Sequence, residues 1–268
     1  MTHLVANARM YSVTPAVKAA WQNLLAWVAQ ASGIPLSYVD HAPPAPLEAL
    51  WARPDLGAAF MCGFPFAAAV PRPQLLAAPV PAPPRYQGKP VYCTDFIVRA
   101  DRPFMRLSET FGGRLGWTVV HSQSGYNAVR HHLLGRADAR FEWIGPLVTP
   151  RRVIEALLSG AIDVGPLDSY VHDLLRRHDP EIAAKLHTVE STVMTPIPPL
   201  VAAASTDADA VARLREALLS CHAEPALALT LDTLLLSCFA EVAPADYQPL
   251  LVQAEHADAG RVPAPGHP

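Results

Sequence analysis

The segment His121–Tyr126, with the sequence HSQSGY, carries the residues that are best suited to bind an anion. It follows a predicted strand over 115–120 and opens a predicted helix over 124–134. Serine hydroxyls at such a position, Ser122 and Ser124, cap a helix, and Gly125 lets a ligand approach the backbone. The unpaired N–H groups and the dipole of a helix start favour negative charge. An ordinary N-cap explains the same residues, so both interpretations stay open.

Two further loops place polar residues at the start of a predicted helix. Thr149-Pro150-Arg151-Arg152 puts two arginines in a first helical turn, where positive charge is disfavoured. An anion could compensate them, or both side chains could extend into solvent. Asp168 stands between a strand over 162–167 and a helix over 169–177. Capping of that helix is the favoured role for Asp168, and contact with a polar or cationic group of a ligand is the alternative.

Aromatic residues follow two predicted strands in the first part of the chain. Tyr11 lies after the first strand, and Phe64 and Phe66 lie in the segment Cys62–Phe66 after the third. Aromatic walls with few polar groups suit a small-molecule cleft, although the same rings could belong to the core. Tyr92 and Thr94 lie on a predicted strand over 91–100, where the chain would pass from one lobe to another.

Other kinds of chemistry have little support in the sequence. The histidines, among them His131, His132, His172 and His178, show no recognised ligand spacing, and we expect them to be solvated or at helix ends rather than to bind a metal. The GxGxxG, P-loop and GxSxG patterns are absent, so no cofactor is expected. Ser124 as a nucleophile would need a base that the sequence does not indicate.

Composition narrows the class of partner. Of 268 residues, 51% are hydrophobic and 17% are charged, against about 45–50% and about 25% in typical domains, which indicates a globular chain. The net charge of -3 offers no attraction to nucleic acid or to an anionic membrane, so small ligands or other proteins are the expected partners. No stretch reaches the roughly 18 apolar residues of a transmembrane segment. The first residues lack the features of a secretory leader, so the chain as written is predicted to be cytoplasmic, or periplasmic if a leader was removed.

The order of elements predicts an α/β protein with two lobes. Helical spacing of Val17, Trp21, Leu24 and Val28 after Thr14-Pro15 begins a pattern in which strands and helices alternate. Residues 1–95 and 195–268 are expected to form the first lobe, and residues 96–194 the second. Residues 75–80 fit a strand, but the proline-rich stretch 71–90 is expected to be a surface connection rather than sheet interior. The part after about residue 207 is expected to be mostly helical.

The four cysteines show no CxxC pairing. Buried thiols are the favoured interpretation, and a disulfide between Cys62 and Cys93 is the alternative that the spacing leaves open.

Five segments together resemble the PhnD-like phosphate, phosphite and phosphonate substrate-binding proteins of ABC transporters, which have the type 2 periplasmic-binding-protein fold. In chain order they are ARMYSVTP at 8–15, CGFPF at 62–66, VYCTDFIVRA at 91–100, HSQSGYNAVR at 121–130 and TPRRVIEALLSGAIDVGPLDSYV at 149–171. The resemblance implies a ligand cleft between two lobes and a small anionic solute, phosphonate-like, phosphate-like or a carboxylate. It also implies an ABC permease as a partner.

By this resemblance Ser122, Gln123, Ser124 and Gly125 would hold the anion, with Tyr11, Phe64 and Tyr92 as walls. The complete set of expected ligand-binding residues also includes Thr94, Thr149, Arg151 and Asp168. The alternative is a cytosolic enzyme that is similar in architecture, such as a chorismate dehydratase or an enzyme of thiamine-precursor synthesis. In that case Asp168 or a neighbouring carboxylate would act as acid or base.

Overall fold

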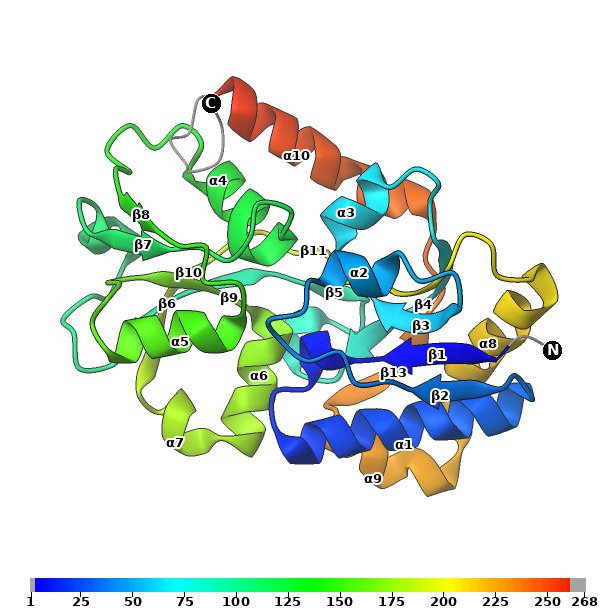
Figure 1. The fold of residues 1–268 in the computed structure, drawn as a ribbon. Helices are drawn as coiled ribbons and strands as arrows, with labels where there is room; N and C mark the ends of the chain where they lie inside the picture. Colours follow the sequence, from blue (N-terminus) through cyan, green and yellow to red (C-terminus); the bar gives the residue numbers. More distant parts are fainter. Residues whose placement is uncertain (1–2, 261–268) are drawn as a thin grey trace. The chain divides into compact units, whose positions relative to one another are not determined.

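The computed structural model describes residues 3–260, and their contacts group the chain into two units (Figure 1). Within the described residues, unit 1 comprises the chain up to Val91 together with Pro196–Tyr247, and unit 2 comprises Tyr92–Thr195 together with the residues from Gln248. The first two boundaries lie close to those expected at 95/96 and 194/195.

Unit 1 is built on a six-stranded sheet with the strand order β13-β4-β12-β3-β1-β2. β1 is parallel to β2 and β3, whereas β12 is antiparallel to β3 and β4, and β13 is antiparallel to β4. Its strands are β1 (Leu4–Asn7), β2 (Leu36–Tyr38), β3 (Leu56–Phe60), β4 (Gln74–Pro81), β12 (Leu200–Ala202) and β13 (Leu236–Ala240).

The longest helix of unit 1 forms as its sequence predicts. The Thr14 hydroxyl accepts from the N–H of Val17 at 3.3 Å, and the helix ends at Gly33, whose φ of 63° suits a residue without a side chain. The ring of Trp21 packs edge-on against Phe60, with 5.0 Å between centroids. The helices of unit 1 are α1 (Pro15–Ser32), α2 (Leu47–Trp51), α3 (Gly63–Ala68), α8 (Ala208–Ser220) and α9 (Ala228–Thr233).

One expectation for this sheet is wrong. The proline-rich stretch supplies β4, which is buried and lies between β12 and β13 in the sheet. Pro79 and Pro81 are accommodated because β4 pairs with β13 through a register shift, so the ladder is irregular there. The part after residue 207 is mostly helical, as expected, and its one strand in the described residues, β13, pairs with β4 at the edge of the sheet.

Unit 2 contains a three-stranded sheet, β10-β6-β9, and a parallel pair, β7-β8. A parallel bridge between Leu115 and Val164 links the pair to the chain just before β9. Phe96, Leu107, Leu115 and Val129 belong to the core that these strands cover. The strands are β6 (Thr94–Arg99), β7 (Arg114–Gly116), β8 (Glu142–Ile144), β9 (Gly165–Asp168) and β10 (Leu186–Ser191).

The chain passes between the units on two short strands that pair with each other, β5 (Val91–Tyr92) and β11 (Thr195–Pro196). The predicted long strand over 91–100 is therefore two strands, β5 and β6. The helical segments of unit 2 are the π-helical turn η4 (Gln123–Asn127), α4 (Ala128–Leu133), α5 (Pro150–Leu158), α6 (Ser169–His178), α7 (Pro180–Ala183) and α10 (Gln248–Ala259).

The last helix differs from the expected division of the chain. The sequence predicts that residues 195–268 belong to the first lobe, but α10 packs on α4 and η4 of unit 2. Leu250, Ala254 and Ala257 are buried and recur at helical spacing along one side of α10.

His172 is neither solvated nor at a helix end, so that expectation is wrong for it, whereas His132 lies in the last turn of α4, as expected. His172 is 1% exposed, and its Nδ1 lies 2.8 Å from Oδ2 of the fully buried Asp95. The hydroxyl of Ser191 donates to Oδ1 of the same carboxylate at 2.7 Å. His132 bonds to Glu190 at 2.7 Å and is also partly buried. These polar groups are tolerated in the interior because each is hydrogen-bonded there.

Replacement of His172 with alanine is expected to lower the free energy of unfolding by about 3–5 kcal/mol, because it leaves the Asp95 carboxylate buried without one of its partners. Equilibrium urea denaturation measures the change. His256→Ala removes an exposed histidine of the same unit and serves as the control. A loss no larger than that of the control would contradict the role given to the pair.

Candidate solute-binding site

One edge of the unit 2 sheet collects most of the residues that the sequence singled out. β7 and β8 run parallel, and β7 is also bridged in parallel to Val164, so the loops that follow all three strands leave from the same edge. β6 runs the opposite way, which places its first residue, Thr94, opposite Asp168 at the end of β9. Residues far apart in the sequence therefore meet at this edge.

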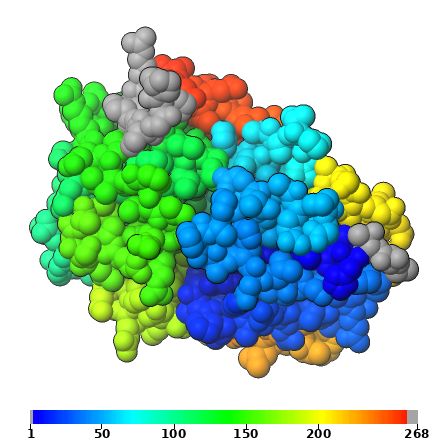
Figure 2. All heavy atoms as spheres, in the orientation of Figure 1, coloured from blue at the N-terminus to red at the C-terminus, as the bar shows by residue number. Residues whose placement is uncertain are grey.

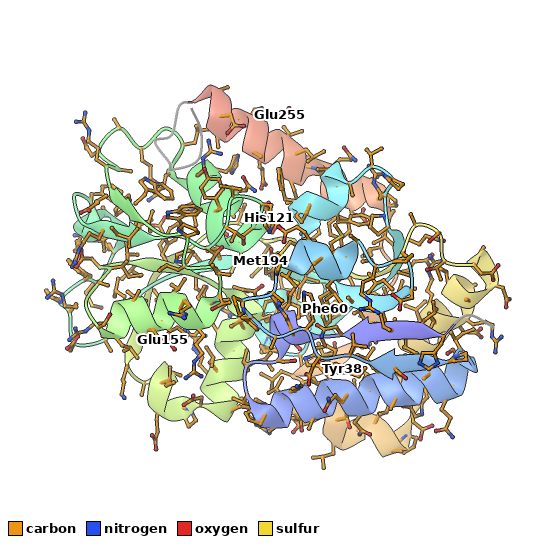
Figure 3. The ribbon with its side chains drawn as sticks, in the orientation of Figure 1. Tyr38, Phe60, His121, Glu155, Met194 and Glu255 are labelled. Atoms are coloured by element: carbon orange, nitrogen blue, oxygen red, sulfur yellow. The ribbon has the colours of Figure 1, made fainter. Side chains whose placement is uncertain are left out.

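Hydrogen bonds join these loops to one another. The hydroxyl of Thr94 donates to the carbonyl oxygen of Ser124 at 2.9 Å. The N–H of Leu147 donates to the Trp117 carbonyl at 2.8 Å, and the N–H of Val148 donates to the Thr118 carbonyl at 3.3 Å. The loop that carries Thr149 and the loop that carries His121 (Figure 3) thus lie side by side.

The turn η4 offers hydrogen-bond donors that the protein itself does not use. Ser122 caps it, since its hydroxyl accepts from the N–H of Gly125 at 3.0 Å and its carbonyl from the N–H of Asn127 at 3.0 Å. Within residues 3–260, no acceptor bonds the N–H groups of Gln123 and Ser124 or the hydroxyl of Ser124. Ser122, Gln123 and Gly125 are buried, and Ser124 is the partly exposed member of the four.

Gly125 is required because Thr118 lies directly against it. A Cβ at position 125 would collide with the Oγ1 of Thr118 and would lie 2.8 and 2.9 Å from its Cγ2 and Cβ. The N–H of Thr118 also donates to the Gly125 carbonyl at 3.2 Å. No local signal in the sequence indicates Thr118, because its contact with Gly125 depends on how the segment after β7 packs against the start of η4.

Three other predicted ligand-binding residues of unit 2 already form bonds within the protein. The Thr149 hydroxyl caps α5 by accepting from the N–H of Arg152 at 3.2 Å, and Nε of the exposed Arg151 lies 3.0 Å from Glu155 one turn along (Figure 3). Asp168 accepts from the N–H groups of Tyr170 and Val171 at 2.8 and 3.1 Å. Asp168 therefore caps α6, the role that the sequence favoured.

An ion pair holds together the starts of the strands whose other ends carry these loops. The Asp163 carboxylate accepts from the backbone N–H of Arg114 at 2.9 Å and from its guanidinium at 3.1 Å. The hydrogen bond from the Arg114 guanidinium lowers the pKa of Asp163, so the carboxylate stays charged at neutral pH. It connects the start of β7 to the segment before β9.

Two apolar side chains of the loops at this edge are exposed to solvent. Val120 and Val148 are each 46% exposed. Val148 has a φ of 64°, which is a strained conformation for a β-branched residue. It immediately precedes Thr149, the cap of α5.

The aromatic residues that were predicted to line the site are divided between the two units. In unit 1, Tyr11 is buried and packs edge-on against Phe60 with 4.8 Å between centroids, and Phe64 is partly exposed in the first turn of α3. Phe66 is buried and packs against Tyr247 at 5.1 Å, so it is a core residue. In unit 2, Tyr92 is buried in β5. All four cysteines are thiols.

The family comparison decides the class of this protein. Residues 12–247 match the family described as "ABC transporter, phosphonate, periplasmic substrate-binding protein". The chain belongs to this family. The phosphonate-binding family consists of receptors that bind a solute, so this chain is a solute-binding protein, and the enzyme alternative has no support.

Solved structures agree with the fold of this phosphonate-family protein. A binding-protein component of an ABC phosphonate transporter from Pseudomonas aeruginosa matches with a TM-score of 0.80 at 18% identity, covering 98% of this chain and 90% of that one. PhnD1 from Prochlorococcus marinus, in complex with methylphosphonate, matches with a TM-score of 0.78 at 13% identity, covering 96% and 98%. A protein of Xanthomonas citri bound to ATP matches with a TM-score of 0.65 at 19% identity, covering 97% and 98%.

The TM-scores of these matches establish the two-lobed α/β periplasmic-binding-protein fold. No curated protein sequence matches the chain. Among residues 3–260, no helix is both long enough and apolar enough to span a bilayer.

Substitution of Gly125 by alanine is expected to lower the free energy of unfolding by about 1–3 kcal/mol, because the new methyl group and Thr118 cannot both fit. Urea denaturation measures the loss. Thr118→Gly removes all three colliding atoms, so the double variant should recover part of the stability that Gly125→Ala loses. A Gly125→Ala protein as stable as the wild type would show that the contact is absent.

Proposed function

We propose that this protein binds a small organic phosphonate, or a closely related oxyanion, at the start of η4. The observation that carries the proposal is the group of three donors without an acceptor in the described chain: the N–H groups of Gln123 and Ser124 and the hydroxyl of Ser124. A tetrahedral oxyanion presents several acceptor oxygens, which suits donors that converge from one turn of backbone.

The electrostatic field of the turn favours an anion even without a lysine or arginine that is dedicated to binding it. η4 continues directly into α4, so its N–H groups stand at the positive end of an eleven-residue helical segment, Gln123–Leu133. The guanidinium of Arg151, one of the predicted ligand-binding residues, is paired with Glu155. Backbone amides and hydroxyls would therefore supply most of the binding.

The apolar side chains beside the donors favour an organic anion over inorganic phosphate. Val120 and Val148 would lose exposed apolar surface against an alkyl group, at roughly 25 cal/mol per Å² buried. PhnD1 of Prochlorococcus marinus was solved with methylphosphonate, which makes this compound the first probe to test.

The other predicted residues take supporting roles in this proposal. Thr94 holds the Ser124 carbonyl, Ser122 and Gly125 shape the turn, and Thr149 and Asp168 hold the helices that follow the adjacent loops. Contacts of the solute with Tyr11, Phe64, Tyr92 and Arg151 stay predictions, as does closure of the two lobes on the ligand.

The family also suggests where and with what the protein works. We propose that it functions in the periplasm and delivers its solute to an ABC permease, as the description of its family implies.

Isothermal titration with methylphosphonate, inorganic phosphate and acetate tests the proposal. Methylphosphonate should bind most tightly, and Ser124→Ala should weaken its binding about tenfold or more, because a hydrogen bond to a charged group is lost. Ser108→Ala, which removes an exposed hydroxyl of the same unit, should leave affinity unchanged. Absence of binding to all three probes, or equal affinity of Ser124→Ala and the wild type, would refute the proposal.

A further inference from the structure

Helix α10 lies outside the matched residues 12–247, yet it packs on the segment that carries the proposed anion site. Its contacts are with α4 and with the turn η4, both in unit 2, and the helices lie side by side in Figure 1. Leu250, Ala254 and Ala257 form its buried side. Its other side, which includes the exposed Glu255, faces solvent (Figures 2 and 3).

A buried arginine of α4 depends on α10 for its counter-ion. The side chain of Arg130 is 3% exposed, and its Nη2 donates to the Asp258 carboxylate at 2.6 Å. The same guanidinium stands over the ring of Tyr126, with its Cζ 5.2 Å from the ring centroid, which is within the reach of about 6 Å of a cation–π contact. Within residues 3–260, Nε of Arg130 is buried without a hydrogen-bond partner, so Asp258 is the ionic partner that the structure gives this charge.

Tyr126 belongs to η4, so the ion pair is connected to the proposed site through one ring. A buried guanidinium without its carboxylate must shift toward water or draw water in, because an uncompensated charge is costly in the interior. Such a shift would remove the cation from the Tyr126 ring and would release the turn that this ring occupies.

A second residue of α10 reaches the turn directly. Oε1 of Gln253 accepts from Nε2 of Gln123 at 3.4 Å, and Gln123 is fully buried. Among residues 3–260, Oε1 of Gln123 has no partner, so Gln253 is the contact that orients this amide. Gln253 also borders a cavity of about 190 Å³ together with Ala128, His131 and Thr195. Shortening Gln253 would therefore enlarge an existing space rather than open a new void in the core.

We propose that α10 is a clamp that holds the anion-binding turn in its binding conformation, with Asp258 and Gln253 as positioning residues. Only the predicted effect of the clamp on affinity depends on the proposed function. Its structural content, an η4 turn that is ordered by α10, holds whichever solute is bound. Preordering of the turn lowers the entropic cost of binding, so loss of the clamp weakens affinity without removal of any donor.

The test compares Asp258→Asn with Glu255→Gln, which makes the same carboxylate-to-amide change on the exposed side of the same helix. In the absence of ligand, Asp258→Asn should speed amide hydrogen exchange at residues 123–128 about tenfold or more and leave β6 and β9 unchanged. Affinity for methylphosphonate should fall about tenfold. Gln253→Ala, which keeps the ion pair, should act in the same direction with a smaller effect, and Glu255→Gln should do neither.

The two readouts separate the clamp from the proposed function. Unchanged exchange at 123–128 in Asp258→Asn overturns the clamp, and so does equal acceleration in β6 and β9, which would indicate general loss of stability. If wild-type protein fails to bind methylphosphonate, the proposed ligand is wrong, and the exchange experiment still decides whether α10 orders the turn.

Discussion

The candidate site depends on the close approach of Thr118 to Gly125. The end of β7 and the start of η4 touch where no side chain fits, and the Thr118 N–H donates to the Gly125 carbonyl. This contact fixes the direction in which the first N–H groups of η4 point. Without it, the amides of Gln123 and Ser124 would have no defined place relative to the loop at Val148, and a ligand would meet a mobile turn rather than a set of oriented donors.

The rest of unit 2 can be understood as support for that contact. The parallel arrangement of β7, β8 and the chain before β9 brings three loops to one edge, and Arg114 and Asp163 hold the strands together at their starts. The buried pair of His172 and Asp95 joins α6 to β6 behind the edge. Burial of these polar groups is tolerated because each is bonded. Among residues 3–260, the backbone N–H groups of Gln123 and Ser124 in η4 still lack an acceptor.

The sequence predicted the parts of this arrangement that depend on local signals. The cap and apolar spacing of α1, the position of η4 after a strand and the capping role of Asp168 all follow from residues that are close together in the chain. It could not predict features set by distant contacts. A strand over 75–80 is predicted, but its place inside the sheet as β4, despite its prolines, is not. β13 is a strand within an apolar stretch that could equally be helical, and His172 is buried because Asp95 is opposite. Thr118 and α10 belong to the site through packing alone.

The central claim is that a bound oxyanion meets the amides of Gln123 and Ser124. A titration of ¹⁵N-labelled protein with methylphosphonate, followed by amide chemical shifts, tests it most directly. The account predicts that the amide signals of Gln123 and Ser124 move furthest, downfield and with a common saturation curve, as expected for N–H groups that acquire a charged acceptor. Saturable binding whose largest shifts lie elsewhere, with the signals of Gln123 and Ser124 unmoved, would contradict it.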